Sequence, residues 1–265
     1  MRITGVINQK GGVGKTAVTV GVAGALAERG HRVLVADVDP QGHLTATALR
    51  LPRVAEHEPS LAAALAGDYA GDPSALVVTH STTPAAGRLD VLPTSLRMFT
   101  AMRDLDKRPD RERQLTRLLD HVVDRYDHVL LDAPPALDIL TDNILAAADG
   151  VLIPVQPDDS SIEALRILLA QVRTLQHALQ RSPLELHGLI PSCYRRPLST
   201  IDRTVMERLA EIEGLPVLGH LPLAVVIKEA WRAGQPVTMH AADSEAASTY
   251  RAIAETLSTQ EVVAR

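Results

Sequence analysis

Short apolar runs alternate with longer amphipathic stretches along almost the whole chain. The short runs, rich in β-branched residues, predict strands, and the longer stretches predict helices. The predicted strands cover residues 2–8, 32–38, 75–79, 89–93, 127–132, 150–156, 185–191 and 217–221. The predicted helices cover residues 14–29, 59–66, 95–105, 110–124, 138–148, 161–178, 199–212, 225–232 and 244–258. This alternation indicates an α/β fold with a mostly parallel, twisted sheet covered by helices on both faces.

No repeat or low-complexity linker divides the chain, so residues 1–265 are predicted to form a single domain. The segment 51–88, punctuated by proline and glycine, is expected to be its least regular part. Ser160 and Glu163 have the spacing of a capping box ahead of an apolar run, which predicts a capped helix start. Because the chain opens on a strand-like segment, we expect no leader peptide and no helix-turn-helix domain before it.

Composition narrows the range of functions. The longest apolar runs, such as 150–157, are far shorter than the roughly 18 residues of a membrane span, so we expect a cytoplasmic protein. A net charge of −5 argues against a globally basic nucleic-acid binder, and 2% aromatic residues argue against a base-stacking platform for single strands. One cysteine, Cys193, excludes an internal disulfide and a cysteine-only metal cluster, and we expect it to fill the core.

A glycine-rich turn follows the first predicted strand and precedes a predicted helix. This stretch, QKGGVGKT, contains two of the four lysines of the chain, Lys10 and Lys15. Such glycines let backbone N–H groups converge on an anion at a helix N-terminus. The strict phosphate-loop pattern requires glycine where Gln9 stands, but Gly14, Lys15 and Thr16 keep its essential end. We expect Lys15 to bind the β- and γ-phosphates and the Thr16 hydroxyl to ligate Mg²⁺.

Carboxylates follow two other predicted strands. Asp37 and Asp39 lie at the end of the second strand, and Asp132 ends the strand 127–132. The carboxyl ends of strands in an open parallel sheet share one crevice, so we expect these side chains to face the phosphate loop. Mg²⁺ prefers one or two carboxylates together with water and phosphate oxygens. Asp132 is the candidate for that role, and the alternative is a carboxylate that caps the following turn.

The stretches NQKGGVGKT, DVDPQGH and LLDAPP together resemble the ParA/MinD branch of P-loop ATPases, specifically ParA-type partition proteins, whose loop is called a deviant Walker A motif. The resemblance covers essentially the whole chain, and it implies ATP and Mg²⁺ as cofactors. It implies that Lys10 reaches across a nucleotide-sandwich homodimer to phosphates bound by the other subunit, like an arginine finger supplied in trans. The nucleotide-binding residues that it implies are Lys10, Gly11, Gly12, Val13, Gly14, Lys15, Thr16 and Ala17.

The resemblance also implies roles for the other two motifs. Asp39 would orient the attacking water, which gives a catalytic set of Lys10, Lys15 and Asp39. Metal ligands would be Thr16, Asp39 and Asp132, with the carboxylates acting through water. Switch residues would be Asp37, Pro40, Gln41, Ala133, Pro134 and Pro135. The implied cycle is ATP binding, dimerisation, non-specific DNA binding on the nucleoid, and slow hydrolysis accelerated by a ParB-like centromere-binding partner. Weak intrinsic turnover is expected, because no arginine finger is apparent within the chain.

Three positions depart from the ParA pattern. Ala17 stands where a second threonine is usual, and we expect weaker nucleotide affinity or altered kinetics from the missing hydroxyl. His43 replaces an asparagine and is expected to be an exposed loop residue. Trp231 stands where a proline is common, and it is expected either to pack or to anchor an interface.

The segment in which DNA-binding residues are expected is not strongly basic. Within residues 190–235, six basic residues are nearly cancelled by five acidic ones. A patch could still form where two subunits align their arginines, and binding would then be sensitive to salt. The candidates are Arg195, Arg196, Lys228 and Arg232.

Other classes of related ATPase fit the sequence less well. A MinD-like membrane ATPase would end in a basic amphipathic helix, which residues 250–265 do not resemble, so no membrane partner is expected. An electron donor like the nitrogenase iron protein would need two cluster cysteines. A carboxylate-activating synthetase would need a substrate pocket, and DVDPQG fits it poorly. The alternative that stays closest is a ParA relative that positions another cargo on the nucleoid.

Overall fold

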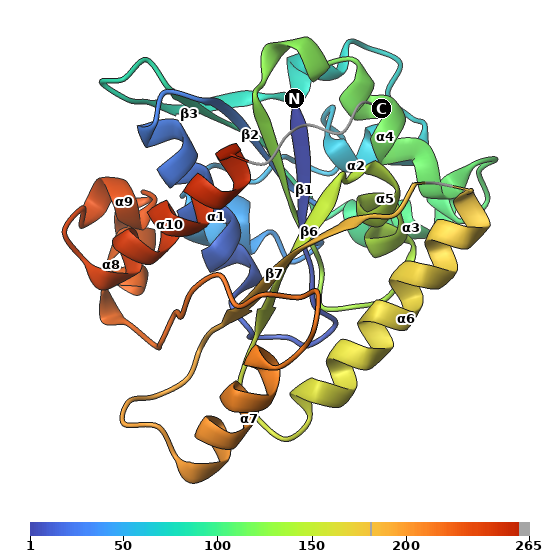
Figure 1. Cartoon of the computed structure of the whole chain (residues 1–265). Helices are drawn as coiled ribbons and strands as arrows, with labels where there is room; N and C mark the ends of the chain where they lie inside the picture. Colours follow the sequence, from blue (N-terminus) through green and yellow to red (C-terminus); the bar gives the residue numbers. More distant parts are fainter. Residues whose placement is uncertain (181, 260–265) are drawn as a thin grey trace.

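A seven-stranded sheet forms the centre of the computed structural model, which describes residues 1–180 and 182–259 (Figure 1). The strand order is β3-β4-β2-β5-β1-β6-β7, and every neighbouring pair is parallel except β3 with β4. The strands are β1 (Arg2–Val6), β2 (Arg32–Asp37), β3 (Val78–Thr82), β4 (Arg88–Leu92), β5 (His128–Asp132), β6 (Gly150–Val155) and β7 (Glu185–Pro191). The predicted α/β fold with a mostly parallel sheet is confirmed.

Helices cover both faces of this sheet, and each face has its own hydrophobic cluster (Figure 1). One face carries α1 (Lys15–Glu28), the π-helix η1 (His43–Ala48), α8 (Val225–Ala233), α9 (Val237–His240) and α10 (Glu245–Thr259). The other carries α2 (Leu61–Ala66), α3 (Met98–Leu105), α4 (Gln114–Asp120), α5 (Ile139–Ala147), α6 (Ser161–Leu179) and α7 (Thr200–Ala210). In the described ranges, no helix is both long enough and apolar enough to cross a membrane.

Helix α1 is enclosed by the sheet on one side and by α10 on the other. Its apolar residues are buried on nearly all sides. A Cβ atom on Gly21 would lie only 2.4 Å from the Tyr250 ring, so the glycine is what allows α10 to pack this closely. Because α1 starts directly after the glycine-rich turn, the packing of α1 fixes the position of the turn relative to the sheet.

One predicted strand is displaced and another is wrong. The segment 75–79 overlaps β3 only at residues 78 and 79, and the strand starts three residues late. Its beginning is the 3₁₀ turn η2 (Pro73–Leu76), because Asp72 accepts a hydrogen bond from Ser74 N at 2.9 Å and Pro73 favours a helical start. The segment 217–221 makes only isolated bridges, from Val217 to Leu189 of β7 and from Leu221 to Ser192 just after it. Pro216 and Pro222 flank this segment, and proline has no backbone N–H to continue the hydrogen-bond ladder of a sheet.

Two helix predictions are also wrong. Residues 110–124 form the 3₁₀ turns η3 (Arg111–Arg113) and η4 (Val123–Arg125) on either side of the short α4. The Asn143 side chain of α5 holds this break, because it accepts from Leu115 N and donates to Arg111 O. Ser160 makes no capping hydrogen bond, since its hydroxyl donates to Asp158.

The other predicted helices are present, with shifted ends in some cases, and η1 and α9 are additional helices that were not predicted. A capping box does occur at Ser199 and Asp202, at the start of α7. Residues 260–265, part of the stretch 250–265 that does not resemble a basic membrane helix, lie outside the described residues.

Candidate nucleotide site

The glycine-rich turn lies at the carboxyl end of β1 and leads directly into α1. Gly14 is the N-cap of α1, with a left-handed φ of 88° and no side-chain cap. A residue with a side chain would be strained there, and its Cβ would lie 3.2 Å from Cys193 Sγ. The first amides of α1 are thus left without a side-chain acceptor, which is the arrangement that binds anions at a helix N-terminus.

Lys15 and Thr16 connect this turn to β5. The Lys15 ammonium donates to the Lys10 carbonyl at 3.1 Å, and the residue is only 7% exposed. Thr16 Oγ1 donates to Asp132 Oδ2 at 2.7 Å, and Thr19 Oγ1 donates to the other oxygen at 3.0 Å. The structure therefore brings together the three residues that the sequence analysis assigned to phosphate and metal binding.

Asp132 and Asp37 are neighbours in the sheet and are both fully buried. Burial raises the pKa of Asp132 to about 7, although the hydroxyl groups of Thr16 and Thr19 and the charge of Lys15 act in the opposite direction. Burial and the nearby Asp132 raise the pKa of Asp37 to about 8. Burial lowers the pKa of Lys15, against the attraction of the nearby carboxylates. The site thus holds more carboxylates than cations, and a bound cation would balance it.

The donor set fits Mg²⁺ that is held mainly by phosphate and water. Thr16 and Asp39 line the cleft and offer oxygens there, and Asp132 lies buried behind Thr16, whose hydroxyl donates to it. Within the part of the chain that the structure describes, no group of three or more acidic, histidine or cysteine side chains could form an all-protein metal site. Mg²⁺ in nucleotide sites usually has one or two carboxylates and keeps several waters, so the residues present are sufficient.

The segment after β2 places its two aspartates differently. Asp39 lines the cleft, and its Oδ1 accepts a hydrogen bond from Gln41 N at 2.9 Å. Asp37 does not line the cleft: its Oδ2 accepts from Thr45 N at 2.8 Å and from Thr45 Oγ1 at 2.6 Å. Asp37 therefore holds η1 in place through Thr45, whereas Asp39 faces the cleft beside the phosphate loop. Exposed His43 lies on η1, not in a loop.

The remaining switch residues surround the same edge of the sheet. Pro40, Ala133 and Pro134 are buried, whereas Gln41 and Pro135 are exposed and line the cleft. A Cβ on Gly11 would lie 3.7 Å from Pro135, so the turn after β5 packs against the glycine-rich turn.

Lys10 points away from the cleft. Its ammonium forms an ion pair with Asp158 and donates to Ser160 Oγ at 3.2 Å, at the start of α6. Its backbone N–H donates to Asn8 Oδ1 at 2.9 Å. The side chain is 30% exposed. The two loop lysines are thus directed to different surroundings.

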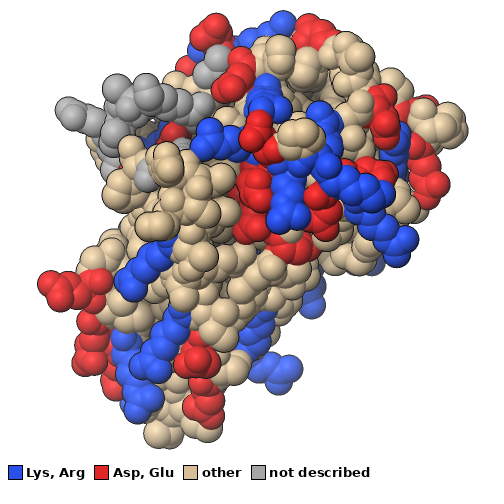
Figure 2. All heavy atoms as spheres, turned by 90° about the vertical axis from the view of Figure 1, so that its right-hand side faces the viewer, with Lys and Arg blue, Asp and Glu red and all other residues tan. Residues whose placement is uncertain are grey.

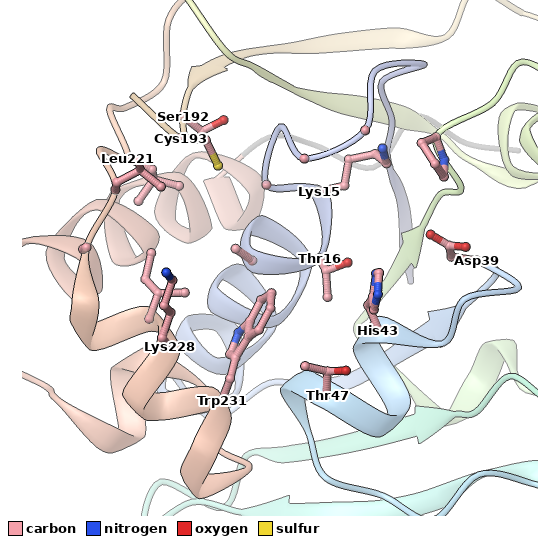
Figure 3. A pocket seen from close by; sticks show the side chains of 18 of the residues that line it. Lys15, Thr16, Asp39, His43, Thr47, Ser192, Cys193, Leu221, Lys228 and Trp231 are labelled. Atoms are coloured by element: carbon pink, nitrogen blue, oxygen red, sulfur yellow. The ribbon is translucent and has the colours of Figure 1, made fainter. Parts of the chain in front are cut away.

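A cleft of about 530 Å³ extends from the glycine-rich turn to α8 (Figure 3). Much of its wall was not predicted from the sequence, including Thr47, Ser192, Cys193, Leu221, Leu223 and Ile227. Cys193 was expected to fill the core, but it is only half-buried, has a φ of 58° and faces the cleft. These residues come from segments far apart in sequence, and nothing in their local pattern indicates that they meet.

The four DNA candidates do not form one unpaired group. Arg196 makes two hydrogen bonds to the Glu245 carboxylate, at 2.9 and 2.6 Å, so its charge is locally balanced. Arg195 and Arg232 are exposed, and Lys228 is exposed at the rim of the cleft. On the face shown in Figure 2, basic and acidic side chains are intermixed.

Comparison with known proteins identifies the family. A family model described as an AAA domain matches residues 1–185. An uncharacterized protein of Mycobacterium tuberculosis is 35% identical over 257 residues, which cover 97% of this chain and 78% of that protein. The chromosome-partitioning ATPase Soj of Treponema pallidum is 32% identical over 260 residues, which cover 98% and 96%.

A solved structure extends the similarity to three dimensions. Cobyrinic acid a,c-diamide synthase from Mycobacterium smegmatis, with a bound ATP analog and magnesium, has a TM-score of 0.76 and 31% identity, covering 97% of this chain and 94% of that one. Together with the loop geometry, these matches show that the chain belongs to the ParA/Soj/MinD family of P-loop ATPases.

Proposed function

We propose that this chain is a single-domain, ATP-driven switch for DNA partition. With ATP and Mg²⁺ bound at the loop, two copies form a sandwich dimer that binds DNA non-specifically on the nucleoid. Hydrolysis, stimulated by a ParB-like centromere-binding protein, releases the dimer. The observation that carries the proposal is the convergence of Lys15, Thr16 and Asp132 at one edge of the sheet, while Lys10 lies outside the cleft.

The loop residues would hold the nucleotide by its phosphates. The amides of residues 10–17 supply donors, and Lys15 leaves the Lys10 carbonyl to bind the β- and γ-phosphates. Thr16 and Asp132 would hold Mg²⁺, which neutralises charge on the phosphates when bound. Asp39 lines the cleft and is free to orient a water through its second carboxylate oxygen. Similarity to a solved relative that carries an ATP analog and magnesium supports this assignment.

Lys10 would act on the phosphates of a partner subunit. To do so its ammonium exchanges Asp158 and Ser160 for the phosphate oxygens of the other active site. A cation that arrives only on dimerisation would make both hydrolysis and the dimer depend on the nucleotide. DNA would then be bound by charges that two subunits align. Within the described residues Arg195, Lys228 and Arg232 form no ion pair, whereas Arg196 would have to leave Glu245.

Co-sedimentation with non-specific DNA tests the proposal. We expect the wild type to sediment with DNA in ATP but not in ADP or without nucleotide, and Lys15→Ala to remain in solution under all three conditions. Adding 0.1 M salt should weaken the ATP-dependent association, because phosphate contacts release counterions. Sedimentation that is indifferent to nucleotide would show that the switch is wrong.

Two alternatives give different results. A ParA relative that positions another cargo would bind DNA in the same way, but a ParB-like protein on its centromere site would not stimulate its ATPase activity.

The second alternative is an enzyme that amidates a carboxylate, which the likeness to the M. smegmatis synthase favours. In that case cobyrinic acid with an ammonia donor, and not DNA, should stimulate ATP hydrolysis and yield an amide.

A further inference from the structure

The cleft has two chemically different ends. The glycine-rich turn, Lys15 and Thr16 form a polar end. The opposite end is formed by α8, the segment before it and α10, and is mainly apolar. Its side chains include Leu221, Pro222, Leu223, Ile227, Trp231 and Tyr250. A ligand that fills the whole cleft must therefore combine a highly charged part with an apolar part.

Trp231 is the one tryptophan of the chain, and its indole is half-buried in this apolar end. Figure 3 shows the ring directed from α8 into the cleft, toward the side on which Thr16 lies. Arg50 Nε donates to the Trp231 carbonyl at 3.1 Å, and the neighbouring Ala230 is fully buried, so the backbone that carries the ring is fixed. Within the described residues the N–H of this half-buried indole makes no hydrogen bond.

Ala17 follows Thr16 directly and lines the same cleft as Ile227 and Trp231. It therefore adds a methyl group, where a threonine would add a hydroxyl, to the wall next to the loop. A nucleoside triphosphate has the matching form: charged phosphates at one end and, at the other, a flat base with two apolar faces. With the phosphates at the loop, the base is drawn to the apolar end.

We propose that Trp231 recognises the nucleobase, with its indole stacked on the base of the nucleotide whose phosphates bind at the glycine-rich turn. This inference rests on the proposed function. Every base has a π-face, so stacking tolerates differences between bases, and a purine offers the larger face. The protein should accordingly discriminate weakly between ATP and GTP and bind both more tightly than CTP.

Calorimetric titration with Mg²⁺ and either ATP or inorganic tripolyphosphate tests the inference. Trp231→Ala should weaken ATP binding roughly tenfold, the usual scale for loss of one base–aromatic stack, and leave tripolyphosphate binding unchanged. Trp231→Phe should restore much of the ATP affinity. Phe99→Ala, which removes a 48% exposed ring on α3, is the matched control and should bind both ligands like the wild type. In the wild type, ATP but not tripolyphosphate should change the tryptophan emission.

Three outcomes would overturn the inference. If Trp231→Ala binds ATP as tightly as the wild type, the indole does not contact the base. If it loses both ligands equally, Trp231 supports the structure of the cleft and not the base. If the wild type binds neither ligand, the proposed nucleotide site itself is wrong, and this failure is distinct from the first two.

Discussion

Lys15 and Lys10 lie in one short loop, yet their ammonium groups have opposite surroundings. Lys15 is 7% exposed and lies close to the carboxylates of Asp132, at the end of β5, and Asp39, just after β2. Lys10 is 30% exposed, and its partner Asp158 is 35% exposed. The loop therefore presents one lysine to an enclosed, low-dielectric site and the other to a solvated ion pair.

The difference determines which lysine can change partners. An exposed ion pair contributes about 0–1 kcal/mol, because solvent screens the charges and both side chains lose freedom. Exchanging Asp158 for another anion therefore costs little. A lysine inside a buried acidic site is far more expensive to remove, since each carboxylate would lose its compensation. The first arrangement suits a group that acts between subunits, and the second suits one that stays in its own site.

The largest expected effect is on the enclosed lysine. Lys15→Ala should reduce ATP affinity by about a hundredfold or more, because it removes the charge nearest the phosphates and leaves Asp132 without its cation. Calorimetric titration with Mg²⁺ and ATP measures the loss. Lys107→Ala, at a lysine whose side chain is 75% exposed, is the matched control and should bind normally.

A smaller effect on binding is expected at the solvated lysine. Lys10→Ala should leave ATP affinity within a few-fold of the wild type, because the Lys10 ammonium does not line the cleft. It should abolish ATP-dependent dimers in sedimentation velocity and lower turnover about tenfold or more, as loss of a finger supplied in trans does. Equal loss of ATP binding in Lys10→Ala and Lys15→Ala would contradict the division of roles.

Sequence patterns were sufficient to predict where the enclosed lysine, Lys15, and its neighbours lie. Strand, glycine-rich turn and helix in succession place Lys15 and Thr16, and the shared edge of parallel strands places Asp132 beside them. Both rules depend on local spacing and on topology alone. The short apolar runs likewise predicted six of the seven strands of the sheet to within two residues.

The rest depended on contacts that no local pattern encodes. Asp37 was expected to face the loop, but a π-helix starting at His43 brings Thr45 onto its carboxylate and keeps it out of the cleft. Asp158 pairs with Lys10 only because α6 starts beside the loop. Cys193 reaches the cleft through a left-handed backbone conformation that a cysteine rarely adopts.

The buried carboxylates of the Lys15 side predict a dependence of stability on pH. In the folded protein the pKa of Asp37 is about 8 and that of Asp132 is about 7, whereas in the unfolded chain both carboxyl groups have a pKa near 3.8. The folded state thus binds more protons, and the free energy of unfolding should fall as pH rises through this range. Buried His128 and His187, with pKa values lowered to about 4, act in the opposite direction only below about 6.5.

Urea denaturation at pH 6.5 and 8.0 without nucleotide measures this effect. Each carboxyl contributes at most about 1.4 kcal/mol per pH unit, and Asp37→Asn should flatten the dependence. Asp104→Asn, at an exposed aspartate, is the control and should keep the wild-type slope. A stability that is constant or rises between these two pH values would show that the carboxylates are already ionised in the folded protein.

The smallest expected effect concerns the ion pair that holds Lys10. Asp158→Asn removes the negative charge but keeps the side-chain shape, so the Lys10 ammonium should be released for the partner subunit. Since an exposed pair is worth roughly 0.2–1 kcal/mol, the ATP-dependent dimer should tighten by at most about fivefold. Asp159→Asn alters the next, exposed carboxylate, which forms no ion pair within residues 1–180 and 182–259, and should leave dimerisation unchanged. Adding Asp158→Asn to Lys10→Ala should change nothing further, because the released lysine is then absent. A stronger dimer in that double variant would mean that Asp158 acts through α6 and not through Lys10.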